Sequence, residues 1–139
     1  MSYRWVDHMA EVELEIEAPG EREVLEDALR ALAELLGVEP PGSTAARSAE
    51  GEELRSVAVG APDRPALLAA WIEELAFLAE SEGFVALRVV DLQLGADRLH
   101  ATVCGVLGAP PPLVKAVTYH RLAFEPRGAG YLARVVLDV

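Results

Sequence analysis

The sequence predicts an α+β fold in which two helices pack on a mainly antiparallel sheet. Three observations support this class. Apolar residues alternate with glutamates over 11–17, they recur at helical spacing over 21–36 and again over 63–82, and strand-like runs after residue 83 surround two turn segments. With 139 residues, of which 52% are apolar, the chain fits a single domain over 1–139, because this length buries most of its surface without disulfides or metals.

The first part of the chain predicts a strand followed by a helix. Residues 11–17 read Glu-Val-Glu-Leu-Glu-Ile-Glu, which places three apolar side chains on one face of a strand and four glutamates on the other. A Pro-Gly pair ends this strand, and the helix that begins at Glu21 has an acidic first turn and ends at Gly37. Residues 37–51 contain two adjacent prolines and three glycines, so we expect an exposed loop there and the segment most prone to disorder.

The second part predicts one strand, one helix and two β-hairpins. A short strand over 54–59 precedes a helix that starts near Asp63, accommodates Pro65 in its first turn and ends before Gly83. The hairpins consist of strands at 84–94 and 98–107 around a turn at 95–97, and of strands at 113–125 and 131–139 around a turn at 126–130. The full order is therefore about two strands, a helix, a strand, a helix and at least four strands.

The charge balance argues against direct binding of nucleic acid. The chain has 23 acidic and 12 basic residues, a net charge of −11, and such a protein repels a phosphate backbone. The sequence also lacks the phosphate-binding loop GxxxxGKS/T, the GxGxxG pattern, the GxSxG nucleophile elbow and the HExxH metal motif. We therefore expect no catalytic residues and no enzymatic activity.

Cys104 is the only cysteine, so it forms no internal disulfide and fits a reducing compartment. No apolar run approaches the roughly 20 residues of a membrane span, so we expect a cytoplasmic protein without membrane contact. His100 and Cys104 lie four residues apart in a predicted strand, which puts their β-carbons roughly 13 Å apart. A buried structural cysteine therefore fits better than a Cys/His nucleophile pair.

Oxygen ligands occur near both ends of the sequence. Asp7, His8 and Glu11 lie near the start, and Asp138 lies next to the terminal carboxylate of Val139. Hard divalent cations bind several oxygens at about 2.0–2.6 Å, and these groups could supply them if the strands that carry them are neighbours. The alternative is that Glu11 belongs to a solvated acidic strand face, together with the other glutamates of that strand.

Four further residues have both functional and structural interpretations. His8 and His120 at strand ends are candidates for ligands or bases, but a histidine in such a place is more often a structural or surface residue. Lys115 is the only lysine in a chain with eleven arginines. Trp71 lies at helical spacing and is best explained as a core residue.

Residues 114–120 read Val-Lys-Ala-Val-Thr-Tyr-His. This segment is the most specific of several that resemble the archease family, and it is similar to that family's KAVTYH block. The last strand closes on Val-Val-Leu-Asp-Val, similar to the family's hydrophobic-Asp-hydrophobic terminus. The helix at 71–83 ends in Glu-Ser-Glu-Gly, similar to the family's Glu-x-Glu-Gly, and 7–11, Asp-His-Met-Ala-Glu, is similar to its acidic-His-Thr-Ala-Asp motif. The matches follow the family's order over nearly the whole chain.

The resemblance implies a function that the residue patterns alone did not reach. Archeases are accessory proteins of the RtcB-type RNA ligase, a GTP- and manganese-dependent enzyme of tRNA splicing and RNA repair, and they promote its guanylylation and its multiple turnover. They also bind a divalent ion, calcium in the family's site. The implied metal ligands are Glu11, Asp138 and Val139, the last through its terminal carboxylate, and the implied functional or ligase-contacting residues are Lys115, His8 and His120.

The segment 7–11 departs from the family's pattern at two positions. Met9 replaces the usual threonine and Glu11 the usual aspartate, so a hydroxyl is lost and a carboxylate is longer by one methylene, which could weaken or relocate the ion. The main alternative function is a general chaperone or protein-binding module without ligase specificity. A small metal-dependent hydrolase that uses His120 and the carboxylates is the remaining alternative.

Overall fold

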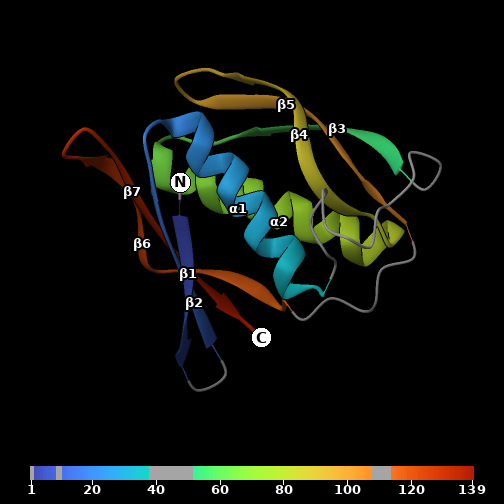
Figure 1. The fold of residues 1–139 in the computed structure, drawn as a ribbon, viewed down its shortest axis with the longest axis horizontal. Coiled ribbons are helices and arrows are strands. Elements are labelled where there is room, and N and C mark those ends of the chain that lie inside the picture. Colours follow the sequence, from blue (N-terminus) through green and yellow to red (C-terminus); the bar gives the residue numbers. More distant parts are fainter. Residues whose placement is uncertain (1, 9–10, 38–51, 108–113) are drawn as a thin grey trace.

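The computed structural model describes residues 2–8, 11–37, 52–107 and 114–139. Within these residues, two helices and seven strands follow the expected order (Figure 1). Their bounds are β1 Ser2–His8, β2 Glu11–Ala18, α1 Glu21–Leu35, β3 Glu52–Gly60, α2 Arg64–Glu82, β4 Val85–Leu94, β5 Arg98–Val106, β6 Ala116–Arg127 and β7 Gly130–Asp138. The α+β class is confirmed, whereas most of the expected loop at 37–51 lies outside the described residues.

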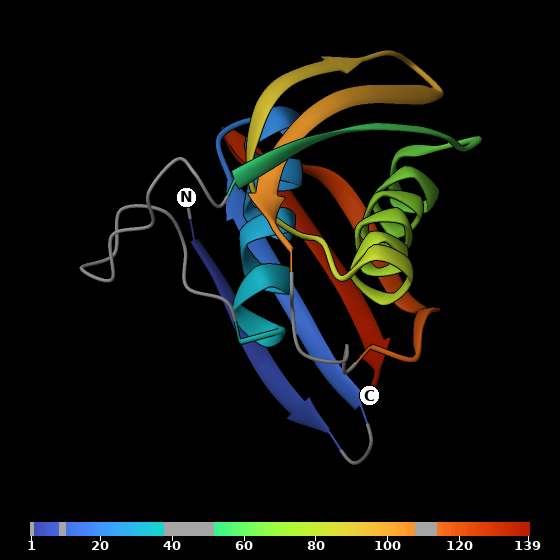
Figure 2. The same cartoon turned by 90° about the vertical axis from the view of Figure 1, so that its right-hand side faces the viewer.

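The expected antiparallel strands are present, and the structure divides them into two sheets, which the sequence does not indicate. Strands β1-β2-β7-β6 form a four-stranded sheet, sheet A, and β3-β5-β4 form a three-stranded sheet, sheet B. Helix α1 contacts β4 and β2, helix α2 contacts β6 and β3, and both helices lie between the sheets (Figure 2). Alternation along a strand fixes which side chains are buried but not which strand pairs with it, so the sequence does not reveal this division.

Local sequence signals explain the bounds of the helices. Helix α2 begins after Asp63, whose Oδ1 accepts a 2.9 Å hydrogen bond from the backbone N–H of Ala66, and Pro65 occupies the first turn as expected. Gly83 after α2 has φ 68° and Gly37 after α1 has φ 82°, a left-handed conformation in which glycine avoids the Cβ clash. Neither helix of the described chain combines the length and apolar character that crossing a membrane requires.

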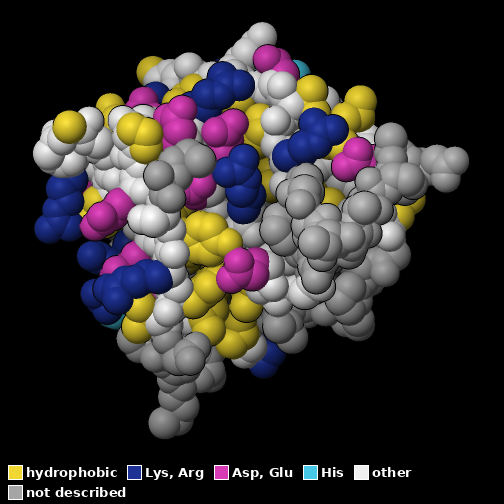
Figure 3. Space-filling view, viewed as in Figure 1, with side chains coloured by type: hydrophobic (Ala, Val, Ile, Leu, Met, Phe, Trp, Pro, Cys, Tyr) yellow, Lys and Arg dark blue, Asp and Glu magenta, His cyan; other side chains and the backbone are white. Residues whose placement is uncertain are grey.

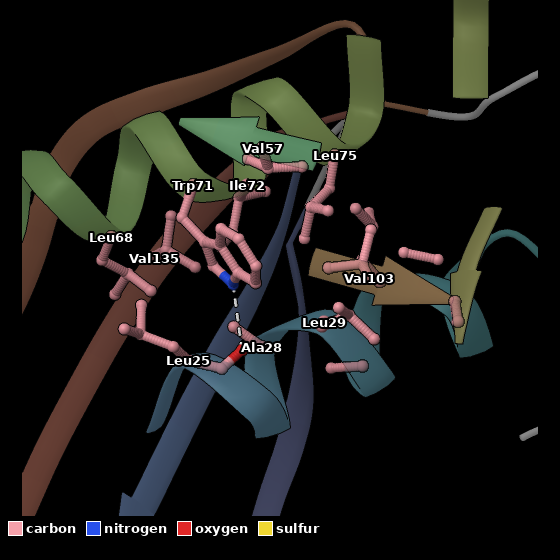
Figure 4. Packing of buried hydrophobic residues seen from close by; sticks show 14 of the residues in the cluster. Leu25, Ala28, Leu29, Val57, Leu68, Trp71, Ile72, Leu75, Val103 and Val135 are labelled. Atoms are coloured by element: carbon pink, nitrogen blue, oxygen red, sulfur yellow. Dashed lines mark hydrogen bonds between the residues drawn. The ribbon is translucent and has the colours of Figure 1, made fainter. Parts of the chain in front are cut away.

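The core lies between the sheets and contains side chains from every layer (Figure 4). Trp71 of α2 is fully buried, and its Nε1 donates a 2.9 Å hydrogen bond to the backbone oxygen of Leu25 in α1. Val57 of β3 and Val135 of β7 belong to the same cluster, so one core joins sheet A, both helices and sheet B. The interpretation of Trp71 as a core residue is confirmed.

The second hairpin is tighter than the sequence indicates. Strand β6 continues to Arg127 and β7 begins at Gly130, so the turn has two residues, of which Gly128 has φ 60°. Pro126, expected in the turn, lies within β6, which is an edge strand of sheet A and can accommodate a residue without an N–H. A Cβ at Gly130 would collide with the backbone oxygen of Ala18, so this position requires glycine.

Acidic and basic side chains are intermingled on the face shown in Figure 3. In the described chain, Arg4 of β1 contacts Glu15 of β2 at 2.8 Å, and Arg64 of α2 contacts Glu21 of α1 at 2.7 Å. The hydrogen bond from Arg4 holds the pKa of the Glu15 carboxyl below its usual value. Pairs of this kind, exposed or only partly buried, contribute about 1 kcal/mol or less each, so the core dominates the stability.

Asp27 of α1 is a buried carboxylate, with 3% of its surface exposed. Its Oδ2 has no hydrogen-bond partner among the described residues, and Arg30 approaches Oδ1 only to 3.7 Å. Burial raises the pKa of the Asp27 carboxyl above its ordinary value of 3.8, and the charge of Arg30 offsets part of this effect. The folded chain therefore binds a proton at Asp27 more tightly than the unfolded chain does.

We expect Asp27 to lower the free energy of unfolding as pH rises from below 3.8 through the raised pKa, because ionisation of a buried group disfavours the folded state. Asp27→Asn removes this ionisation, so the variant should gain on the order of 1 kcal/mol relative to the wild type between acidic and neutral pH. Urea unfolding at both pH values measures the gain. Asp97→Asn, in an exposed turn, is the matched control. A difference between Asp27→Asn and wild type that does not vary with pH would contradict the expectation.

Candidate functional site

The register of sheet A brings Glu11 and Asp138 together. Strands β2 and β7 are antiparallel neighbours, and Glu11 lies directly opposite Asp138. Directly opposed residues project from the same face of a sheet, with β-carbons about 4.5–5.5 Å apart. Both residues are half-buried. The condition stated from the sequence, that strands from the two ends of the chain lie side by side, is met.

The end of β1 and the start of β6 lie at the same end of sheet A as Glu11 and Asp138, near the chain end marked C in Figure 2. His8 in β1 is the register partner of Glu11, and Ala116 in β6 is the partner of Asp138. The backbone N–H of Lys115 donates a 2.7 Å hydrogen bond to the backbone oxygen of Asp138, and Lys115 is exposed. The predicted residues therefore meet along the backbone, although the side chains at the end of β1 lie outside the described part of the chain.

The donors of Glu11 and Asp138 fit a hard divalent cation, because such ions take about six to eight oxygens, largely from carboxylates and backbone carbonyls. Among the described residues, no third His, Cys, Asp or Glu side chain completes a set of three. Val139 packs its side chain against the core, on the opposite face from Asp138. An ion here would therefore take two side-chain carboxylates and a backbone oxygen of Val139, and water or another molecule would complete its shell.

Near this end of sheet A, strand β6 is interrupted by a bulge that the sequence does not indicate. Thr118 pairs with Val136 and Ala123 with Arg134, so four residues of β6, 119–122, lie opposite one residue of β7. These four residues are termed the β6 bulge. Bulges of this kind redirect side chains and are frequent next to functional sites.

Arg121 in the β6 bulge has φ 61°, the only positive φ of a non-glycine residue in the described chain. This conformation costs a residue with a Cβ roughly 1–2 kcal/mol, so an interaction must favour it. The Arg121 guanidinium donates a 2.8 Å hydrogen bond to Oε1 of Glu13 in β2, and Glu13 is only 2% exposed. Arg134 of β7 approaches Oε2 of the same carboxylate to 3.5 Å. The left-handed conformation of Arg121 therefore directs its guanidinium to the buried carboxylate of Glu13. Without a cation beside it, this buried charge would destabilise the fold.

The expectation that the glutamates of β2 form a solvated face is wrong for Glu13. Its carboxylate is covered and paired, whereas Glu11 on the same face is half-buried. One small cavity is lined by Glu11, Glu13, His120, Arg121 and Val136. The bulge and the candidate ion site therefore share a cavity wall. Sequence analysis missed the Glu13–Arg121 pair because its members are 108 residues apart and the bulge contains no glycine or asparagine to mark a left-handed position.

Cys104 is buried, as expected of a structural cysteine. Burial raises the pKa of the Cys104 thiol, which opposes formation of the nucleophilic thiolate. His100 is exposed, and its Nε2 lies 3.2 Å from the hydroxyl of Ser56. The histidine is thus engaged on the outer side of sheet B and does not activate the cysteine.

Comparison with known proteins gives a match over nearly the whole chain. Residues 3–139 match the sequence model of the Archease protein family (MTH1598/TM1083). Protein archease of Methanosarcina acetivorans is 30% identical over 146 aligned residues, which cover 99% of this chain and 95% of that protein. Protein archease of Archaeoglobus fulgidus is 30% identical over 149 aligned residues, which cover 100% of both chains.

Two solved structures share the fold. A crystal structure from Thermotoga maritima, described as an archease and possible chaperone, has a TM-score of 0.67 at 22% identity and covers 96% of this chain and 94% of that chain. The solution structure of Methanobacterium thermoautotrophicum protein 1598 has a TM-score of 0.61 at 24% identity and covers 99% and 98%. At these identities the similarity shows the fold alone, with its two helices and two antiparallel sheets.

Proposed function

The chain belongs to the archease family, and on this premise we propose that it is a non-catalytic, cytoplasmic activator of an RtcB-type RNA ligase in tRNA splicing and RNA repair. It promotes guanylylation of the ligase and its multiple turnover, acts by protein contact, and has a site for a divalent ion, calcium in the family. The observation that carries the proposal is that Glu11, Lys115 and Asp138 lie together at one end of the strands of sheet A.

Glu11, Asp138 and Val139 are the residues that would hold the ion. When bound, the ion supplies a concentrated positive charge that attracts phosphate oxygens. The backbone hydrogen bond from Lys115 to Asp138 keeps the start of β6 against the end of β7, so the backbone of the exposed Lys115 stays next to that of Asp138. Lys115 adds a basic side chain at this end of the sheet. These charges support contact with a nucleotide-bearing active site by a chain whose net charge is −11.

A general chaperone without ligase specificity is the second candidate. Exposed apolar side chains favour it, among them Phe77 at 57% and Leu54 at 59% exposure, because such groups can contact unfolded clients. The Thermotoga relative is also described as a possible chaperone. The two candidates differ in one measurable respect, since only the activator requires a specific enzyme.

The test is the joining of RNA ends by the cognate ligase under multiple-turnover conditions, with and without this protein. We expect the protein to raise the steady-state rate roughly tenfold or more, the effect of about 1.4 kcal/mol on a barrier, and to raise the fraction of guanylylated ligase. The protein alone should join no RNA. Ligation that stays at a single turnover in its presence, with suppressed aggregation of unrelated proteins, would favour the general chaperone.

A further inference from the structure

Three of the four residues of the β6 bulge are exposed beside the candidate ion site: Arg121, which pairs with Glu13, and two others, Tyr119 and His120. Tyr119 is 61% exposed and His120 is exposed, whereas Leu122 of the same bulge is half-buried. His120 also lines the cavity that reaches Glu11. The bulge therefore presents an aromatic ring and an imidazole next to the end of sheet A where Glu11, Lys115 and Asp138 lie together.

The shape of the bulge depends on the ion pair of Glu13 and Arg121. The pairing of β6 with β7 stops at Thr118 and resumes at Ala123, so the strand ladder does not fix the residues between them. In the bulge, the N–H of His120 donates to Oγ1 of Thr118 at 3.3 Å, and Arg121 donates to Glu13 at 2.8 Å. The second bond ends on a carboxylate that is 2% exposed in the central part of sheet A, which makes it the firmer anchor.

The Arg121 guanidinium spans from the edge strand β6 over β7 to β2, because β7 lies between these two strands. Its left-handed backbone conformation is disfavoured for an isolated arginine and persists only where surrounding contacts determine it. The side chain of Arg121 is still 46% exposed, so the pair lies at the boundary between the interior and the surface. A change at Glu13 or Arg121 would therefore be transmitted to Tyr119 and His120.

We propose that Glu13 and Arg121 are positioning residues that hold the β6 bulge in the shape that the ligase contacts, with Tyr119 and His120 as the contact residues. This inference rests on the proposed function. The occupant of the surface is a protein: tyrosine and arginine are enriched in protein interfaces, and a net charge of −11 disfavours RNA. Glu13 and Arg121 lie outside the short motifs at 7–11 and 114–120, and both fall within the residues that match the family model.

Three variants separate positioning from general stability. Arg121→Gln removes the cation from Glu13, Arg121→Lys keeps the charge, and Arg134→Gln removes the other cation near the same carboxylate from a regular strand. Amide hydrogen exchange of 119–122 reports on the bulge, and affinity for the cognate ligase reports on contact. We expect Arg121→Gln to speed exchange and to weaken ligase binding, each roughly tenfold, and Arg121→Lys to restore most of both. Arg134→Gln should change neither, although it lowers the melting temperature.

Tyr119→Ser keeps the inference testable if the Arg121 variants do not fold, because this side chain is 61% exposed. It should weaken ligase binding without changing exchange or melting, and Phe77→Ser, an exposed aromatic on α2, should leave binding intact. Unchanged hydrogen exchange in folded Arg121→Gln, or full ligase affinity of Tyr119→Ser, overturns this inference and leaves the proposed function standing. Wild-type protein that does not bind the ligase overturns the proposed function and, with it, the assignment of the contact residues.

Discussion

Trp71→Ala is expected to lower the free energy of unfolding by about 3–5 kcal/mol. The indole is 0% exposed, lies among side chains of both helices and both sheets, and donates a hydrogen bond to the backbone oxygen of Leu25 (Figure 4). Truncation leaves a large cavity that the two sheets cannot close by a local shift. A domain of this kind is stable by only about 5–15 kcal/mol, so the loss is a large share of the total. Urea unfolding monitored by circular dichroism measures it.

Two further variants identify the cause of the loss. Trp71→Phe keeps a buried ring but loses the hydrogen bond to Leu25, and it should cost about 1–3 kcal/mol. Phe77→Ala on the same helix removes a ring that is 57% exposed, and it should stay within about 0.5 kcal/mol of the wild type. If Trp71→Ala cost no more than Phe77→Ala, the indole would not be part of the core.

Asp138→Asn is expected to remove most of the affinity for calcium and most of the stimulation of the ligase. The substitution keeps the size of the side chain but removes one of the two carboxylates that face each other across β2 and β7. Charge count tunes calcium affinity, so we expect a loss on the order of tenfold or more. The backbone hydrogen bond from Lys115 to residue 138 does not use the side chain, so the ends of β6 and β7 should stay in place. Calorimetry with calcium and multiple-turnover ligation measure the two losses.

Asp91→Asn, an exposed aspartate in β4 of sheet B, is the matched control and should change neither quantity. Calcium affinity that is equal in Asp138→Asn and wild type would rule out the candidate ion site. Lost calcium binding with full stimulation would show instead that the ion is not needed for activation. Melting curves of both variants exclude unfolding as the cause.

Elements with a local signal could be predicted from the sequence. The expected helix starts and ends agree closely with α1 and α2 because Asp63, Gly37 and Gly83 act on their immediate neighbours. The alternation of 11–17 likewise gives β2, since period-two burial needs no knowledge of the partner strand. The division into two sheets could not be predicted, because it depends on which strands pair over long distances.

The candidate site shows the same limit. Residue types alone indicated oxygen donors near both ends of the sequence, but the opposition of Glu11 and Asp138 is a property of the β2–β7 register. The archease resemblance supplied that pairing as an expectation. The Glu13–Arg121 pair lay beyond both approaches, since it combines a long-range contact with an unusual backbone conformation at a residue type that rarely adopts it.

Strand β7 is one of the two inner strands of sheet A, although it follows all the other described strands in the chain. It separates β2 from β6, and even the β2–β7 pair nearest in sequence, Ala18 with Tyr131, encloses both helices and the whole of sheet B. During synthesis on the ribosome, the nascent β1–β2 pair therefore keeps an open backbone edge until β7 leaves the exit tunnel. Sheet A closes only after translation has delivered this strand, so the carboxylates of Glu11 and Asp138 cannot meet before then.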